Sequence, residues 1–180
     1  MLIFFMPDVS IVPCTISDLH TLQDIALNAY GDHYLHLWND GGAWYIEKSF
    51  SDAALKSELE DTDAAFFLVH DADELVGFLK LNNNKALENY SPEDALELER
   101  IYLTKADSGK GVGKQVMNFT EQFARERNKK VIWLKAMDSS HDAIRFYEQN
   151  GYAHCGTYRL DFEAMKPEYR GMVIMKKELN

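Results

Sequence analysis

The chain has 180 residues, of which 46% are hydrophobic, and it carries a formal net charge of −10. This length and apolar content suit one substantial core, so we expect residues 1–180 to form a single domain. The acidic balance argues against nucleic-acid binding, and no apolar run reaches the ~20 residues that span a membrane. Cys14 and Cys155 lack metal-type spacing and are typical of reduced residues in a cytoplasmic protein.

The chain is expected to begin with strands and a helix. Residues 2–6 are apolar but too few for a signal peptide, so they predict an extra edge strand, with Met6 as an alternative start. Residues 9–14 predict the first regular strand. Ser17 is expected to cap a helix of apolar periodicity, and Gly31 is expected to end it.

Residues 32–50 are rich in aromatic side chains, and Gly41 and Gly42 interrupt them. This pattern predicts a short helix, a turn and a second helix. Aromatic residues at such spacing belong to a core more often than to a ligand platform. Carboxylates lie among them, and the mixture can line a pocket for an amine; these carboxylates are Asp32, Asp40 and Glu47. Ser51 is expected to cap a further helix that runs through Glu60.

Residues 64–70 and 75–81 predict two strands joined by a short acidic turn, the pattern of an antiparallel hairpin. After a polar loop comes a strand whose alternation of apolar residues changes phase. Apolar positions are even up to Leu98 and odd from Ile101. A β-bulge near Glu99 produces such a shift, because it inserts one extra residue into the strand.

A glycine turn, Ser-Gly-Lys-Gly-Val-Gly-Lys, occupies residues 108–114 and leads directly into a helix. Backbone N–H groups at a helix start lack intrahelical partners and therefore favour an anion such as a phosphate. The Walker A pattern fails because Ser108 and Gln115 stand at its first and last positions. The dinucleotide pattern also fails, because its third glycine is missing.

The remaining elements are helices and strands in alternation. An amphipathic helix follows the glycine turn, and residues 131–136 form an apolar run typical of a buried strand. Ser139 and Asp142 fit a capping box for another helix, which residues 150–151 close. Two last strands are predicted at the end of the chain, over residues 152–160 and 171–179. This order favours an α/β fold, with a mixed sheet flanked by helices.

Two motifs resemble the GNAT N-acetyltransferase family. The glycine turn is similar to the family pattern Gln/Arg-x-x-Gly-x-Gly/Ala, except that Ser108 replaces the first residue. Residues 143–152, Ala-x-x-Phe-Tyr-Glu-x-x-Gly-Tyr, resemble the family's closing segment, with Ser140 in place of its asparagine. More narrowly, residues 96–102 and 126–133 look like those of bacterial PaiA-type spermidine/spermine acetyltransferases.

The resemblance implies the GNAT fold, with a central sheet of about seven strands and a bulge in the fourth. It also implies acetyl-CoA as the acetyl donor. The bulge would free backbone groups for the pantetheine arm, the glycine turn would hold the pyrophosphate, and the closing helix would complete the site. The cofactor-binding residues expected from it are Ile101, Tyr102, Leu103, Ser108, Gly109, Lys110, Gly111, Val112, Gly113, Lys114, Ser140, Ala143 and Phe146.

Acetyl transfer to an amine needs a base, because alkylamines are mostly protonated at neutral pH. Glu97 and Glu99 lie beside the predicted bulge and are the candidate bases; a solvated strand face is the alternative. Tyr147 matches the family's general acid, which protonates the departing thiolate; the alternative is a packing role. We expect no metal, because His33 and His36 have no evident third ligand.

The sequence therefore predicts an acetyl-CoA-dependent N-acetyltransferase for a primary amine. A polyamine such as spermidine or spermine is favoured by the acidic composition and by the PaiA-type resemblance. Acetylation of a protein amino group or an antibiotic amine is the alternative within enzymes. Because Ser108 and Ser140 depart from the family pattern, a non-catalytic CoA-binding sensor also stays open. A homodimer is a separate possibility that the sequence leaves open.

Overall fold

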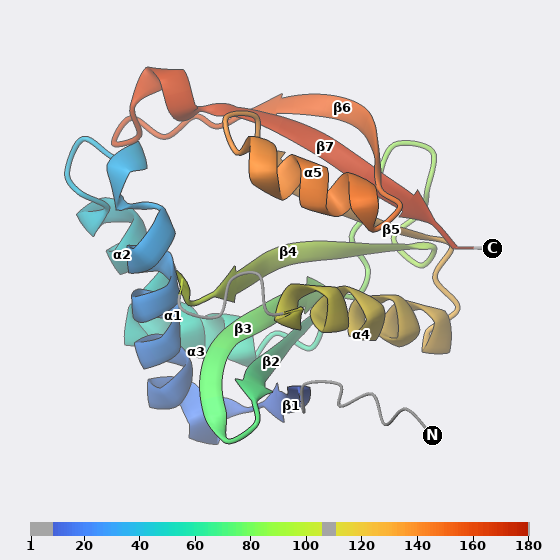
Figure 1. The fold of residues 1–180 in the computed structure, drawn as a ribbon, viewed down its shortest axis with the longest axis horizontal. Coiled ribbons are helices and arrows are strands. Elements are labelled where there is room, and N and C mark those ends of the chain that lie inside the picture. The colour runs from blue at the N-terminus through green and yellow to red at the C-terminus, as the bar shows by residue number, and fades with distance from the viewer. Residues whose placement is uncertain (1–8, 106–110, 180) are drawn as a thin grey trace, which may run out of the picture.

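Within the described part of the chain, seven strands form one mixed sheet in the order β1-β2-β3-β4-β5-β7-β6. The computed structural model describes residues 9–105 and 111–179, so the predictions for residues 2–6 and for Ser108, Gly109 and Lys110 lie outside the described residues (Figure 1). The strands are β1 (Val9–Cys14), β2 (Ala64–Asp71), β3 (Glu74–Asn82), β4 (Ala95–Leu103), β5 (Val131–Met137), β6 (Ala153–Arg159) and β7 (Gly171–Glu178). Of the neighbouring pairs that these seven strands form, β4–β5 alone is parallel, which confirms the predicted mixed sheet.

Five α-helices cover the two faces of this sheet in the described part of the chain. They are α1 (Leu19–His33), α2 (Ala43–Phe50), α3 (Asp52–Leu59), α4 (Val112–Glu126) and α5 (His141–Gln149). Figure 1 shows α4 and α5 over one face, and α1, α2 and α3 gathered at the other. No helix within the described ranges is long and apolar enough to cross a membrane.

Each face has its own apolar core, and strand alternation supplies both. In β3, Leu79 and Leu81 pack beneath α4, whereas Phe78 packs with α1 and α3. The α1 side also buries the aromatic residues Trp38 and Phe50. The prediction that the aromatic segment contributes to a core is therefore confirmed for these two residues.

Local capping signals predicted most helix ends, but three predictions were wrong. The first turn before α1 is capped by Thr15 and not by Ser17, since the Thr15 N–H donates to Asp18 at 2.8 Å. Helix α5 has Ser140 at its N-cap instead of Ser139. Gly31 does not end α1, which continues to His33.

Contacts with residues at and just after the end of β4 stabilise the last turn of α1, beyond Gly31. The His33 ring donates from Nε2 to the Leu103 carbonyl oxygen at 3.1 Å, and Asp32 accepts the Lys105 N–H at 2.9 Å. These two tertiary contacts fix the last helical turn. They outweigh the intrinsic helix penalty of Gly31, which is about 1 kcal/mol relative to alanine.

The predicted bulge is present in β4. Leu98 pairs with Leu81 and Arg100 pairs with Lys80, so Glu99 is the extra residue without a partner in β3. The two side chains at the insertion, Glu99 and Arg100, consequently lie on the same face of the sheet, which is the α3 side.

The bulge creates an ion cluster that consists of Glu58, Lys80, Glu99 and Arg100. Glu58 of α3 contacts Arg100 through both guanidinium nitrogens, at 2.8 and 2.9 Å, and contacts Lys80 at 3.1 Å. Glu99 contacts Lys80 at 2.8 Å and Arg100 at 3.2 Å. The cluster is internally neutral, and it ties the bulge to α3.

Burial raises the pKa of Glu99, but the nearby charges of Arg100 and Lys80 lower it by more, so the net pKa lies below the usual value of a glutamate. A carboxyl group whose pKa is depressed in the folded state stabilises the fold above its unfolded-state pKa of about 4.3. This contribution is lost as the pH falls through the lower, folded-state pKa.

We therefore expect Glu99→Gln to lower the free energy of unfolding near neutral pH by about 1 to 3 kcal/mol, because it leaves buried cations with one carboxylate fewer. Below about pH 4.5 the difference from wild type should shrink, since protonated Glu99 also loses these ion pairs. Denaturant unfolding at a series of pH values measures both effects. Glu60→Gln is the control, because Glu60 is exposed and makes no ion pair with another described residue. Parallel pH curves for wild type and Glu99→Gln would contradict the role of the cluster.

Candidate active site

A cavity of about 490 Å³ opens where β4 and β5 separate. Their parallel pairing covers Ala95–Leu98 and Val131–Leu134, before the bulge, while β5 continues to Met137 along β7. The bulge therefore marks the point from which the later residues of β4 face the cavity instead of β5. Ile101 and Tyr102 line it, whereas Leu103 is absent from its lining and packs against the core beneath α4.

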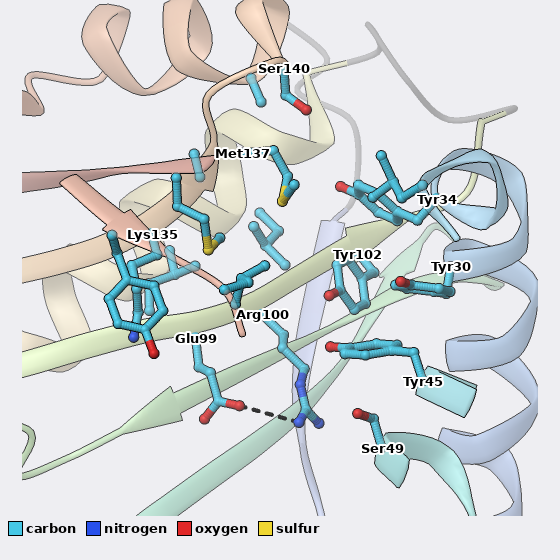
Figure 2. A pocket seen from close by; sticks show the side chains of 18 of the residues that line it. Tyr30, Tyr34, Tyr45, Ser49, Glu99, Arg100, Tyr102, Lys135, Met137 and Ser140 are labelled. Carbon is cyan, nitrogen blue, oxygen red and sulfur yellow. Dashed lines mark ion pairs between the residues drawn. The ribbon is translucent and has the colours of Figure 1, made fainter. Parts of the chain in front are cut away.

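One side of the cavity is a tyrosine wall, which consists of Tyr30, Tyr34, Tyr45 and Tyr102. The rings of Tyr30 and Tyr45 stack with centroids 4.8 Å apart, and Tyr102 lies 5.4 Å from Tyr34. Figure 2 shows the hydroxyl groups of these residues directed toward the interior of the cavity. Because the rings cover one another, the wall presents hydrogen-bonding edges more than open ring faces.

Tyr30, Tyr34 and Tyr102 are neutral at physiological pH. Burial is the main cause that raises the pKa values of Tyr30, Tyr34 and Tyr102 above that of free tyrosine. The Trp38 indole donates to the Tyr30 hydroxyl at 2.7 Å, which leaves the Tyr30 proton available for another acceptor. The wall can thus donate several neutral hydrogen bonds.

The opposite side carries two carboxylates, Glu97 and Glu99. Asn82 joins them, because its amide nitrogen donates to Glu97 at 2.8 Å and to Glu99 at 2.7 Å. Glu97 is only 3% exposed, and Lys135 of β5 lies 3.3 Å from it. Glu99 belongs to the ion cluster, so both carboxylates are already paired with cations in the free protein.

Helix α5 supplies Ser140, Ala143 and Tyr147 to the third side of the cavity. Ser140 is the N-cap of this helix, and Tyr147 lies two turns further along. Burial raises the pKa of Tyr147, with Tyr34 as a smaller cause, so its hydroxyl keeps its proton at neutral pH. A protonated phenol can donate a hydrogen bond or a proton to an anion that forms beside it.

The described end of the glycine turn leads into α4 as predicted, and its two described glycines, Gly111 and Gly113, serve different purposes. Gly111 is the N-cap with φ +88°, a backbone conformation that favours glycine, and apart from its chain neighbours no described residue has an atom within 4 Å of the position a Cβ would take. At Gly113 a Cβ would lie 3.2 Å from the Phe146 ring, so this glycine permits α4 and α5 to approach closely. Phe146 itself packs in the core and is absent from the cavity lining.

The start of α4 is suited to an anion. The N–H groups of Val112, Gly113 and Lys114 belong to the first turn and have no intrahelical acceptor. This turn contains no acidic residue, and the space beside Gly111 is open. Lys114 adds a positive charge, although its ammonium group donates to Asn150 at 2.9 Å. The donor set fits a phosphate group.

Three predicted acceptor residues do not line this cavity: Asp32, Asp40 and Glu47. Asp32 accepts the N–H of Lys105, and Asp40 accepts the N–H groups of Gly42 and Trp44 at the start of α2. Glu47 lies on the exposed side of α2. Asp32 and Asp40 therefore hold the backbone in place.

Several lining residues were not anticipated from the sequence, and the most notable are Lys48, Lys85, Arg100 and Lys135. Their positions depend on contacts between distant segments, and no local motif marks them. The aromatic content of residues 32–50 was a usable signal, because Tyr34 and Tyr45 line the cavity from that segment.

Comparisons with known proteins agree with this architecture. Residues 21–152 match the sequence model of the acetyltransferase (GNAT) family. The chain is 33% identical over 109 residues to an uncharacterized N-acetyltransferase in the pepI 3′ region of Lactobacillus delbrueckii subsp. lactis, covering 61% of this chain and 63% of that protein. It is 34% identical over 108 residues to streptothricin acetyltransferase of Streptomyces lavendulae, covering 59% of this chain and 53% of that protein. In both cases the match spans less than two thirds of the curated relative.

The fold has a counterpart among solved structures. PaiA N-acetyltransferase from Thermoplasma acidophilum, solved in complex with coenzyme A, superposes with a TM-score of 0.71. The alignment covers 96% of this chain and 99% of that chain at 20% sequence identity, a likeness that concerns the fold. Since the family match extends over most of the chain and the sheet, bulge and glycine turn accompany it, this protein belongs to the acetyltransferase (GNAT) family.

Proposed function

We propose that the protein transfers an acetyl group from acetyl-CoA to a primary amine. The observation that carries the proposal is the opening between β4 and β5. One cavity there brings together the strand after the bulge, two carboxylates and Tyr147. The anion-suited start of α4 lies against α5, the helix that supplies Tyr147, through the close approach of Gly113 to Phe146. These are the groups that direct transfer from a thioester to an amine requires.

The donor substrate would be held by backbone groups. The N–H groups of Val112, Gly113 and Lys114, together with the turn from Ser108 to Gly111, would bind the pyrophosphate. Backbone groups of residues 101–103 and the Ser140 hydroxyl would bind the pantetheine arm, and Ala143 leaves room for it. Phe146 would act indirectly, since it packs against Gly113.

On the acceptor side, Glu97 is the better candidate base, because the lowered pKa of Glu99 makes that carboxylate a weak proton acceptor. Attack by the amine nitrogen on the thioester carbon forms the new C–N bond, and the C–S bond then breaks. The proton of the amine would pass toward Glu97, directly or through water. The Tyr147 hydroxyl would supply a proton to the departing sulfur.

A polyamine is the acceptor that the sequence predicts. The carboxylates that line the cavity are Glu97 and Glu99, both already paired with cations, and Asp32, Asp40 and Glu47 lie outside its lining. An antibiotic amine is the second candidate, because one relative is a streptothricin acetyltransferase. Peptide amino groups complete the set of acceptors to be compared.

Purified protein should be stabilised against heat by acetyl-CoA and should release thiol from it when a suitable amine is added. The measurements are a thermal shift and a thiol-release assay with polyamines, streptothricin, amino acids and a peptide at equal concentration. Stabilisation without turnover on any amine would instead support a CoA sensor. Absence of both responses would contradict CoA binding itself.

The glycine turn is tested by Gly111→Val, which places a side chain in the space proposed for phosphate. Acetyl-CoA affinity measured by calorimetry should fall at least tenfold, or about 1.4 kcal/mol. Gly41→Val is the matched control for backbone strain, because Gly41 has φ +68°, open space around its Cβ position and no place in the cavity lining. Equal affinities of both variants and wild type would exclude the turn as the phosphate site.

The role of Tyr147 is tested by Tyr147→Phe, which removes the hydroxyl and keeps the ring. General acids contribute roughly 10²- to 10⁴-fold, so we expect kcat to fall about 100-fold while acetyl-CoA affinity changes little. Tyr152→Phe is the control, because Tyr152 is also a buried tyrosine but lies outside the cavity lining. An unchanged kcat in Tyr147→Phe, with chemistry shown to be rate-limiting, would assign Tyr147 to packing.

A further inference from the structure

The charge of the cavity is opposite in sign to the charge of the protein. Among the described residues, the cavity is lined by four cations, Lys48, Lys85, Arg100 and Lys135, and by two carboxylates, Glu97 and Glu99. The lining therefore sums to +2, in a chain with 29 acidic and 19 basic residues. A polycationic acceptor would meet net repulsion there.

Nearby cations already neutralise both carboxylates, so these groups attract a distant ammonium group only weakly. Glu97 is paired with Lys135, and Glu99 is paired with Lys80 and Arg100. By contrast, Lys48 and Lys85 make no ion pair with another described residue. Lys48 lies over the rings of Trp44 and Phe162, with its ammonium 4.8 and 4.5 Å from their centroids.

The neutral donors are on the same side as Lys48. Ser49 of α2 is buried and lines the cavity next to the tyrosine wall, and Figure 2 shows its hydroxyl directed toward Tyr45 and Arg100. Phenol and serine hydroxyls donate to carboxylate oxygens, and charge-assisted hydrogen bonds of this kind are the stronger ones. Glu99, Lys135 and Glu97 belong to the strands across the cavity, so its two sides differ in the charge that they favour.

We infer that the acceptor is an amino acid or a short peptide whose carboxylate is bound by Lys48 and the tyrosine wall while its amine faces Glu97. The inference rests on the acetyl transfer proposed above and names a different acceptor class from the polyamine. The amine of such a molecule is complementary in charge to the carboxylates of β4, and its carboxylate is complementary to Lys48 of α2, which has no ion-pair partner among the described residues. A diamine of equal length has no carboxylate for Lys48 to bind.

The test compares three acceptors that differ only in the charge at the far end: 5-aminopentanoate, 5-aminopentanamide and 1,5-diaminopentane. Triglycine and its C-terminal amide form a second, longer pair. We expect kcat/KM for the carboxylate member of at least one set to exceed that of its amide about tenfold, and the diamine to be poorest. A diamine preferred over every carboxylate would overturn the inference and leave the acetyltransferase proposal intact.

Lys48→Gln should reduce the carboxylate-to-amide ratio of kcat/KM about tenfold, without weakening acetyl-CoA binding. Lys56→Gln is the matched control, because Lys56 is exposed on α3 and does not line the cavity. An unchanged ratio would overturn the inference, because Lys48 would then not bind the carboxylate of the acceptor. A loss of acetyl-CoA affinity with an unchanged ratio would also overturn it, because Lys48 would then bind the acetyl donor.

A binding measurement separates this inference from the proposed function. The complex with CoA is titrated calorimetrically with the same compounds, which needs no turnover. Tighter binding of the carboxylates than of their amides would support the inference even in a protein that acetylates none of them. Tighter binding of the diamine, or equal binding of the carboxylate and its amide, would overturn it.

Discussion

The single inserted residue in β4 is the constraint on which the candidate site depends. A regular strand would continue its pairing with β5, and Glu99 and Arg100 would lie on opposite faces. With the insertion, both side chains lie on the α3 side, and the parallel pairing with β5 stops at Leu98. One local irregularity thus opens the sheet and also gathers the charges that line the opening.

The ion cluster beneath the bulge explains how such an irregularity is maintained. A buried guanidinium group is costly unless its hydrogen bonds are satisfied, and Arg100 has Glu58 and Glu99 to satisfy it. Because Glu58 comes from α3, the position of the bulge is linked to the helices that carry the tyrosine wall. The ion cluster therefore fixes both the strand and the helices that form the cavity.

Net charge is a poor guide to the potential inside a cavity of this kind. The protein is strongly acidic, yet most of its carboxylates are on its outer surface or act as local backbone acceptors, as Asp40 does. Only a few charged residues line a cavity, and the electrostatic potential inside it depends on which of them lack an oppositely charged partner. Here the unpaired lining charges among the described residues are the cations Lys48 and Lys85, a distribution that bears directly on the acceptor.

The sequence by itself determined the features that depend on neighbouring residues. The change of phase at Glu99 located the bulge, Ser51 and residues 150–151 marked helix ends, and the glycine turn marked the start of α4. These signals are local, because steric preference and capping act within a few residues. For the same reason the sequence misjudged Gly31, where contacts from the distant end of β4 extend the helix.

Only the tertiary structure decided which charged groups share the cavity and which of them are neutralised. Glu58 reaches Arg100 across 42 residues of chain, and Glu97 reaches Lys135 from a different strand. The sequence analysis expected Asp32, Asp40 and Glu47 to line the acceptor pocket, and Glu97 and Glu99 to be candidate bases beside it. The structure separates them: Glu97 lines the cavity and pairs with the distant Lys135, Asp32 accepts the N–H of the distant Lys105, Asp40 accepts local backbone N–H groups, and Glu47 is exposed. Such partners are set by proximity in space, which the spacing of residues in the sequence does not contain.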